Sequence, residues 1–221
     1  MTEQNTTEGR YRNQLDIINP AYENASVVVI GAWGIGSTTV MCLAQMGIKN
    51  ITVIDFDLVE NHNLASQLYK ESDIGKPKVA ALAWNVKEFT GIQITPIMEK
   101  FHPLMVKNAD IVIIGVDNMA TRKEVVEWLT SNTKRFIDWR MQGMAFELHM
   151  FIPVYETQLY MNTWYSDADA SPETCTNKAV SFNTFAIASV ISRLVVWIIQ
   201  DDPFIMKKRN IQVDLANLII Q

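Results

Sequence analysis

Short runs of β-branched and aliphatic residues recur along the first two thirds of the chain, each followed by glycine or polar residues. A short apolar run of this kind is typical of a strand that is covered on both faces. The runs predict five strands, over residues 27–30, 51–54, 92–97, 111–114 and 136–139.

Segments with the helical spacing of apolar residues separate these strands. One helix is expected after the first strand and ends at Gly47, because glycine commonly follows the last helical residue. A second is expected over 78–89, after Pro77, and a third over 119–130. Strands that alternate with helices imply right-handed crossovers and a parallel sheet. The sequence therefore predicts an α/β fold: a Rossmann-like, doubly wound, mostly parallel sheet flanked by helices.

The alternation of strands and helices ends after residue 140, and the pattern there predicts antiparallel strands that extend the sheet. Residues 146–152 and 158–162 alternate in polarity on either side of Pro153, which favours a hairpin. A polar loop is expected over 163–177, followed by a long helix and a final strand over 210–214.

The long helix, over 179–199, is apolar enough to raise the question of a membrane span. Arg193 lies inside it, and an arginine at that depth is costly in lipid. We therefore expect a buried helix and no membrane partner. Residues 23–221 are expected to form one domain, preceded over 1–22 by a tail, disordered to residue 9, and a short helix ending near Pro20.

Composition narrows the possible functions. The chain has 221 residues, 48% hydrophobic and 19% charged, so it can bury a core without disulfide or metal staples. Its formal net charge of -5 argues against a protein whose main function is to bind the phosphate backbone of nucleic acid. Cys42 and Cys175 lie far apart and cannot form a tetrahedral zinc site alone. They suit a reducing compartment and the N-terminus is polar, so we expect a cytoplasmic protein.

A glycine-rich turn after the first strand carries the first candidate chemistry. Gly31, Gly34 and Gly36 precede a helix whose free N–H groups and dipole would attract phosphate oxygens. Asp55 ends the next strand, where a carboxylate can accept hydrogen bonds from ribose hydroxyls. The alternative is a tight strand-to-helix turn without a ligand. Trp33 stands where a dinucleotide-binding turn has glycine, and its indole must point away, stack on the ligand or block the pocket.

Four motifs, in order, resemble those of the ThiF/MoeB family, ATP-dependent adenylyltransferases related to ubiquitin-activating enzymes. The family's Gly-x-Gly-Gly-x-Gly-Ser resembles residues 31–37, and its Asp-Phe-Asp with Val-Glu-x-x-Asn-Leu resembles 55–64. Its Ile-Gly-x-Pro-Lys-Val resembles 74–79, and its Asp-Asn-x-x-x-Arg resembles 117–122. The motifs fall within residues 27–125, and the remainder of the chain is compatible but looser.

The chain departs from the family pattern at three positions. Trp33 replaces a glycine, and Ser66 and Asn13 stand where the family usually has arginine. The four-cysteine zinc site of many members is also missing. We expect Arg12 and Arg140 to supply the triphosphate contacts that these departures remove.

The resemblance implies that a carboxylate attacks the α-phosphorus of ATP and forms an acyl-adenylate with release of pyrophosphate. Lys78 would reach the α-phosphate, Asp117 would hold Mg²⁺, and Asn63 would donate a hydrogen bond to the leaving phosphates. The expected catalytic residues are Lys78, Asp117, Arg140 and Cys175. The expected nucleotide contacts are Gly31, Trp33, Gly34, Gly36, Asp55, Asp57, Asn63, Lys78 and Asp117.

Most of these roles have a structural alternative. Lys78 would be an exposed lysine at a helix start, and Asp117 with Asn118 would be an N-cap pair. Arg122 is expected to bond back to the strand ends. Cys175 either receives the activated carboxylate or serves in sulfur transfer, or it has a structural role; residues 138–141 with this cysteine resemble a small bacterial and phage branch of the family.

The resemblance also implies partners. The substrate would be the C-terminal carboxylate of a ubiquitin-like or sulfur-carrier protein, or of a peptide, and the enzyme would be a homodimer with residues 163–177 as a crossover loop. A second hypothesis is a degenerate homologue that acts as an interaction subunit. The departures from the family pattern at Trp33, Ser66 and Asn13 favour this hypothesis. A nicotinamide oxidoreductase is disfavoured, because a hydride-transfer site does not need the motifs around Lys78 and Asp117.

Overall fold

The computed structural model describes residues 7–142, 144–152, 160–165, 180–202, 210–217 and 219–220. These residues include one sheet with the strand order β3-β2-β1-β4-β5-β6-β7-β8. The strands from β3 to β5 pair in parallel, and β6, β7 and β8 extend the sheet antiparallel. The strands are β1 (Ser26–Ile30), β2 (Asn50–Ile54), β3 (Thr95–Ile97), β4 (Ile111–Ile114), β5 (Arg135–Gln142), β6 (Ala145–Phe151), β7 (Asn210–Asp214) and β8 (Ile219–Ile220).

The predicted fold class is confirmed, and most predicted elements lie where the sequence pattern puts them. The α-helices are α1 (Thr7–Tyr11), α2 (Gly34–Gln45), α3 (Lys78–Thr90), α4 (Met119–Ser131) and α6 (Ser181–Ile199). The 3-10 helices are η2 (Arg12–Gln14), η3 (Pro20–Asn24), η4 (Asn61–Ala65), η5 (Glu71–Asp73) and η6 (Pro103–Val106). Strand β3 is shorter than expected, because Gly91 ends α3 with a φ of 75° and residues 92–94 lead from the helix to the strand.

The predicted pairing of 146–152 with 158–162 is wrong. Strand β6 pairs with β5, from Phe136 opposite Phe151 to Gln142 opposite Ala145, and on its other edge with β7. Tyr160 lies in a helical turn, and residues 153–159 lie outside the described residues. Only residues 143–144 join β5 to β6, and so short a connection favours an antiparallel pair over any distant partner.

The N-terminal segment also differs from the expectation. Thr7–Tyr11 forms α1, so the described part of the expected tail is helical, and the expected helix over 10–22 is broken into 3-10 turns. Pro20 cannot donate a backbone hydrogen bond, which disfavours a continuous helix there. Tyr22 fastens the segment to the domain, because its hydroxyl donates to the carbonyl of Met46.

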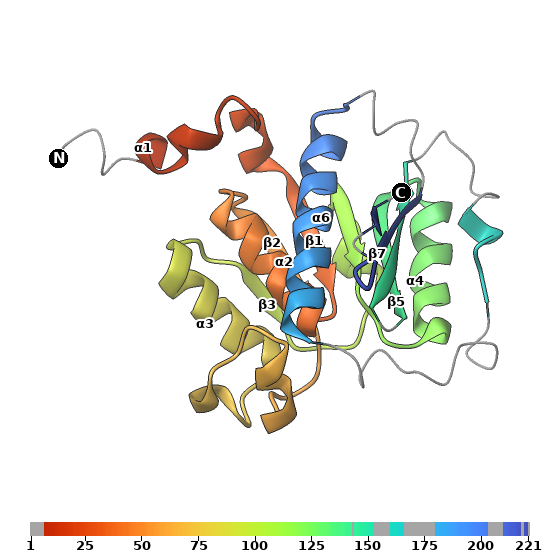
Figure 1. The fold of residues 1–221 in the computed structure, drawn as a ribbon, viewed down its shortest axis with the longest axis horizontal. Helices are drawn as coiled ribbons and strands as arrows, with labels where there is room; N and C mark the ends of the chain where they lie inside the picture. The colour runs from red at the N-terminus through yellow and green to blue at the C-terminus, as the bar shows by residue number, and fades with distance from the viewer. Residues whose placement is uncertain are drawn as a thin grey trace.

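Helices cover both faces of the sheet (Figure 1). Successive residues of a strand point to opposite faces, and β1 shows this directly. Val27 and Val29 pack into the cluster formed with α2, α3 and α6, whereas Val28 and Ile30 pack into the cluster formed with α4. The unbroken apolar run of β1 therefore follows from burial on both sides.

Helix α6 is long and apolar enough to cross a membrane by length and composition. In the fold it packs against α2, and residues such as Ile187, Ile191 and Leu194 are fully buried. The prediction of a buried helix is confirmed.

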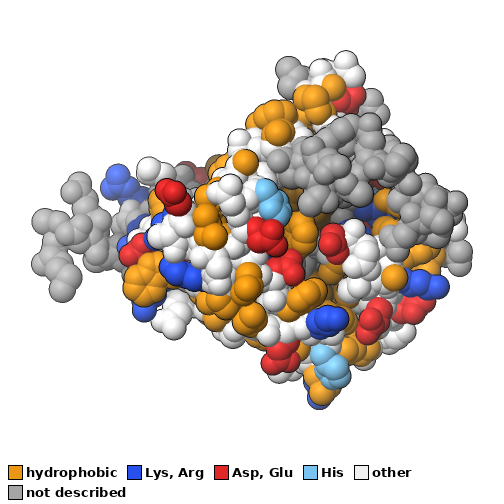
Figure 2. Space-filling view, turned by 90° about the horizontal axis from the view of Figure 1, so that it is seen from below, with side chains coloured by type: hydrophobic (Ala, Val, Ile, Leu, Met, Phe, Trp, Pro, Cys, Tyr) orange, Lys and Arg blue, Asp and Glu red, His pale blue; other side chains and the backbone are white. Residues whose placement is uncertain are grey.

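The sheet has a switch point between β1 and β4. The chain leaves β1 into α2 on one face and leaves β4 into α4 on the other face. Such a reversal opens a crevice at the carboxyl ends of the two strands, where doubly wound sheets bind ligands. Figure 2 looks onto this end of the molecule, where acidic and basic side chains are interspersed with apolar ones.

Candidate nucleotide site

The turn after β1 requires glycine for its backbone packing. Gly31 has a φ of 100°, and a Cβ there would lie 2.4 Å from the carbonyl oxygen of Gly115 at the end of β4. A Cβ on Gly36 would lie 2.0 Å from the carbonyl oxygen of Gly31. Because no side chain fits these positions, both glycines are explained by the turn itself, and no ligand is needed to explain them.

Two side chains clamp this turn. Asp55 accepts the Ala32 N–H at 2.7 Å, and the Tyr69 hydroxyl donates to the Ala32 carbonyl at 2.6 Å. The second carboxylate oxygen of Asp55 accepts the backbone N–H of Asp57 at 2.8 Å. Burial raises the pKa of Asp55 above its usual range. Each oxygen has a second lone pair, so a ribose hydroxyl would add to these hydrogen bonds without replacing them.

A cavity of about 160 Å³ lies at the switch point. The N-terminus of α2 opens into it, with the backbone of Gly34 in the wall. A Cβ on Gly34 would lie 2.7 Å from Cγ2 of Thr184, so α6 closes this side. The lining residues are Trp33, Gly34, Ile35, His62, Ser66, Gln67, Gly115, Val116, Asp117, Trp139, Met141 and Thr184.

Asp117 lines this cavity and the neighbouring Asn118 caps α4. The Asn118 side chain accepts the Thr121 N–H at 2.8 Å, so the N-cap role belongs to that residue alone. One oxygen of Asp117 accepts the Asn118 amide at 3.1 Å, and the side chain is exposed. Mg²⁺ in nucleotide sites is typically held by one or two carboxylates together with phosphate oxygens, and Asp117 fits that donor set.

Lys78 is buried, which contradicts the alternative of an exposed lysine at a helix start. Lys78 is 2% exposed, and its ammonium nitrogen lies 3.0 Å from Oδ2 of Asp57. The same Nζ lies 4.1 Å from the centroid of the Trp33 ring. The indole therefore lines the cavity on one side and contacts Lys78, and this contact holds the lysine next to the cavity wall.

Asn63 stabilises η4, the segment that carries part of the cavity wall. It is 2% exposed, and its side-chain oxygen accepts the Glu60 N–H at 2.8 Å in a capping box. Its carbonyl accepts the N–H groups of Ser66 and Gln67 at 3.2 and 3.0 Å. These hydrogen bonds fix η4, and with it His62 and Ser66, against the cavity.

Arg140 lies on the other face of the sheet from the cavity. Trp139 and Met141 of β5 line the cavity, so the alternate residues Asp138 and Arg140 point away from it. Arg140 donates to Asp138 at 3.0 Å and to the Thr163 carbonyl at 2.6 Å. The structure does not bring Arg140 to the expected triphosphate site.

Arg122 shares the same carboxylate. Its guanidinium donates to Asp138, to the Trp139 carbonyl at 3.1 Å and to the carbonyl of Val116. The prediction that Arg122 bonds back to the strand ends is confirmed.

Arg12 and Cys42 are not among the described residues that line the cavity. Arg12 is exposed in η2. Cys42 is half-buried in α2, where burial raises the pKa of its thiol. Cys175 lies outside the described residues, as does most of the expected loop over 163–177.

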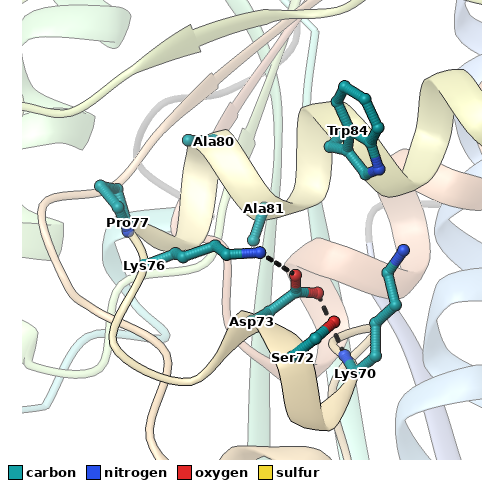
Figure 3. A pocket seen from close by; sticks show the side chains of 8 residues that line it. All are labelled: Lys70, Ser72, Asp73, Lys76, Pro77, Ala80, Ala81 and Trp84. Atoms are coloured by element: carbon teal, nitrogen blue, oxygen red, sulfur yellow. Dashed lines mark hydrogen bonds and ion pairs between the residues drawn. The ribbon is translucent and has the colours of Figure 1, made fainter.

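A larger open hollow of about 530 Å³ lies beside α3 and η5 (Figure 3). Its lining residues are Lys70, Ser72, Asp73, Lys76, Pro77, Ala80, Ala81 and Trp84. Figure 3 shows the Asp73 carboxylate between the Lys76 ammonium and the backbone of Lys70. None of the predicted catalytic or nucleotide-contacting residues lines this hollow, so we place the candidate site at the smaller cavity.

Sequence reasoning missed several residues of the cavity, among them His62, Trp139 and Met141. His62 lies inside the motif over 55–64, and its position beside Asn63 was the available signal. Trp139 ends the strand predicted over 136–139 and Met141 follows it, but their face of the sheet depends on register, which a single strand does not reveal.

The sheet, its switch point and the cavity there define the class of the protein, a Rossmann-like α/β domain with a ligand crevice. The model of the ThiF family matches residues 19–221. The chain belongs to the ThiF family.

Curated relatives match part of the chain. The probable adenylyltransferase/sulfurtransferase MoeZ of Mycobacterium tuberculosis is 32% identical over 137 residues, which are 56% of this chain and 34% of that protein. The NEDD8-activating enzyme E1 catalytic subunit of Arabidopsis thaliana is 34% identical over 104 residues, 45% of this chain and 23% of that protein. The chain therefore spans only about a quarter to a third of these two relatives.

Solved structures share the fold over the whole chain. Escherichia coli MccB, in a crystal structure with AMPCPP and MccA, has a TM-score of 0.76 and 22% identity and covers 100% of this chain and 72% of that one. PaaA has a TM-score of 0.77 and 16% identity, with 100% and 75% covered. At these identities the likeness establishes the fold.

Proposed function

We propose that the chain is an ATP-dependent adenylyltransferase that activates a carboxylate as an acyl-adenylate, with release of pyrophosphate. The observation that carries this proposal is the cavity at the switch point, which the N-terminus of α2 and Asp117 both line and whose Trp33 ring contacts Lys78. A helix N-terminus attracts phosphate, and a carboxylate beside it can bind the magnesium that accompanies a triphosphate.

The reaction needs positioning and charge neutralisation more than proton transfer. A carboxylate nucleophile is already ionised at neutral pH, so no general base is required. The barrier lies in bringing two anions together and in stabilising charge on the phosphoryl oxygens. Lys78 would approach the α-phosphate, and Asp117 would hold Mg²⁺, which supplies charge neutralisation when bound. Asp55 and Asp57 would contact the ribose side, and Gly31, Gly34 and Gly36 shape the phosphate-binding turn.

We propose the C-terminal carboxylate of a ubiquitin-like protein, a sulfur-carrier protein or a peptide as the substrate class. The relatives named for adenylylation and sulfur transfer, for NEDD8 activation and for a complex with MccA support a protein or peptide carboxylate. Cys175 remains a candidate acceptor of the activated carboxylate.

The experiment that tests this proposal is ATP–pyrophosphate exchange. Purified protein is incubated with Mg-ATP, labelled pyrophosphate and candidate carrier proteins or peptides, with a carrier lacking its C-terminal residue as the control. We expect carrier-dependent exchange that falls by about 100-fold or more in Lys78→Ala and Asp117→Ala. Lys76→Ala, which removes an exposed lysine two residues away, should keep the exchange. Exchange that survives Lys78→Ala would overturn the proposal.

We also propose a homodimer that uses the outward side of α6. Phe182 and Phe185 lie one turn apart and are 54% and 50% exposed, an apolar pair that a second copy would cover. Light scattering should give twice the monomer mass, and Phe182→Ser with Phe185→Ser should give a monomer. A monomeric native protein would exclude this arrangement.

The second candidate function is a nucleotide-binding or purely structural interaction subunit. The observation that favours it is the engagement of Lys78 by Asp57 and Trp33, which leaves its ammonium already partnered. Calorimetry with Mg-ATP separates the two functions. Binding without exchange, or no binding at all, would support the interaction subunit.

A further inference from the structure

The charge of the cavity is unusual for a site that would hold a polyphosphate. Asp117 is the acidic residue in its described lining, and neither lysine nor arginine is among the described lining residues. Lys78 contacts the Trp33 ring and is paired with Asp57, and Arg140 points to the opposite face of the sheet. Within the described lining, His62 is therefore the one side chain able to carry positive charge.

The position of His62 is fixed by the segment that carries it. Asn63 holds η4 through its capping box with Glu60, and the carbonyl of Asn63 accepts the N–H groups of Ser66 and Gln67. His62 itself remains 63% exposed, so its ring can reach a ligand without unfolding its surroundings. Nδ1 lies 3.4 Å from Oε2 of Glu60, whose side chain is also exposed. This contact leaves Nε2 for the ligand.

We propose that His62 is a binding residue for the pyrophosphate portion of the nucleotide, donating from Nε2 to a phosphate oxygen at the cavity wall. The inference rests on the proposed nucleotide site. It places the polyphosphate between the N-terminus of α2, whose Gly34 and Ile35 line the cavity, and the η4 wall with His62 and Ser66. A ring N–H that donates to an anionic oxygen makes a hydrogen bond with a charged acceptor, which is the stronger kind.

Binding is measured by calorimetry with three probes: Mg-ATP, Mg-pyrophosphate and AMP. His62→Ala should weaken Mg-ATP and Mg-pyrophosphate about tenfold, the usual cost of one charged hydrogen bond, and leave AMP unchanged. His62→Gln keeps a neutral hydrogen-bond donor, so its affinities for Mg-ATP and Mg-pyrophosphate should lie between those of the wild type and those of His62→Ala. His102→Ala removes an exposed histidine that is not among the cavity-lining residues and should change none of the three affinities.

A relocated charge provides the rescue. Ser66 lines the same wall four residues further on, so Ser66→Arg in the His62→Ala background would return a cation to the polyphosphate. We expect this double variant to regain most of the lost pyrophosphate affinity. A Ser66→Arg substitution that restores nothing would overturn the proposal, as would a His62→Ala protein with unchanged pyrophosphate affinity.

The outcomes separate this inference from the proposed function. Exchange activity with pyrophosphate affinity independent of His62 would leave the adenylyltransferase standing and remove His62 from its site. Pyrophosphate binding that depends on His62 without any carrier-dependent exchange would do the reverse. A loss of AMP affinity in His62→Ala equal to that of Mg-ATP would place the histidine at the nucleoside or would report a general collapse, and would contradict the polyphosphate assignment. A thermal melt of each variant identifies such a collapse.

Discussion

The Lys78 ammonium lies 4.1 Å from the centroid of the Trp33 ring while it is paired with Asp57 at 3.0 Å. A family motif with glycine at this position offers no such ring. The indole therefore gives Lys78 a resting position next to the cavity, stabilised by a cation–π contact of about 0.5–2 kcal/mol. A phosphate oxygen offers a stronger partner, because the interaction is between full charges.

We predict that Mg-ATP draws the Lys78 ammonium away from the Trp33 ring. The measurement is tryptophan fluorescence, compared between the wild type and Trp33→Phe so that the other tryptophans cancel. The wild type should show a larger ATP-dependent change in emission than Trp33→Phe and Lys78→Met, in which only the cavity-lining Trp139 still responds. Trp84→Phe, which removes an indole of the outer hollow, should keep the change. If Trp33→Phe responds to ATP as the wild type does, the ring does not sense the lysine.

Asp117 and Asn118 are adjacent, and the structure gives them separate tasks. Asn118 caps α4, so Asn118→Ala should lower the free energy of unfolding by about 1 kcal/mol. Asp117→Ala should leave stability nearly unchanged and should remove the magnesium dependence of ATP binding. Urea unfolding and calorimetry with and without Mg²⁺ measure the two effects. Equal losses of stability in both variants would show that Asp117 belongs to the cap.

Asp138 balances two buried guanidinium groups. It is 0% exposed and accepts hydrogen bonds from Arg122, Arg140 and the Tyr160 hydroxyl. Asp138→Ala leaves both cations without their shared partner, and breaking a buried ion pair typically costs about 3–5 kcal/mol. Urea unfolding should show this loss.

A second substitution at the same network tests where Arg140 acts. Because Arg140 points away from the cavity, Arg140→Met should change stability but leave Mg-ATP affinity within about twofold, the range of a distant site. A large loss of ATP affinity in a well-folded Arg140→Met protein would return this arginine to the nucleotide site.

The sequence alone predicts the parallel core of this fold well, because its strands are buried on both faces and their apolar runs are unbroken. The run over 27–30 is one such case, and β1 lies there with alternate residues in two cores. The antiparallel extension was harder to predict, because polarity alternation does not distinguish a strand from the helical turn that Tyr160 and Met161 form. The pairing of β6 with β5 follows from the short connection between these two strands. The prediction from polarity alternation did not take the length of this connection into account.

The candidate site was predicted in part. Gly34, Trp33 and Asp117 meet at one cavity because they follow neighbouring strands of a parallel sheet, a relation that sequence order reveals. Arg140 was misplaced because the side of a strand on which a residue lies depends on register. His62 was missed because its exposure and its direction follow from the 3-10 turn held by Asn63, which no local pattern of apolar residues encodes.

The last prediction concerns acid stability and the outer hollow of Figure 3. Burial alone would raise the pKa of Asp73, but hydrogen bonds from Asn85, from the Lys70 N–H and from Lys76 outweigh it and hold the pKa below its usual range. The unfolded chain therefore takes up this proton at a higher pH than the folded chain does. The carboxylate stabilises the fold fully above the unfolded pKa, and that contribution is lost as the pH falls through the folded pKa.

Asp73→Asn should accordingly destabilise the protein by about 1–3 kcal/mol at pH 7, because the charged acceptor of three hydrogen bonds is lost. The difference from the wild type should narrow as the pH falls below about 4, where the wild-type carboxylate begins to protonate in the unfolded chain. Urea unfolding between pH 7 and pH 3.5 measures both values. Asp16→Asn, at an exposed position, should stay within about 0.5 kcal/mol throughout. A gap between Asp73→Asn and the wild type that stays constant down to pH 3.5 would mean that the carboxylate charge is not what stabilises this turn.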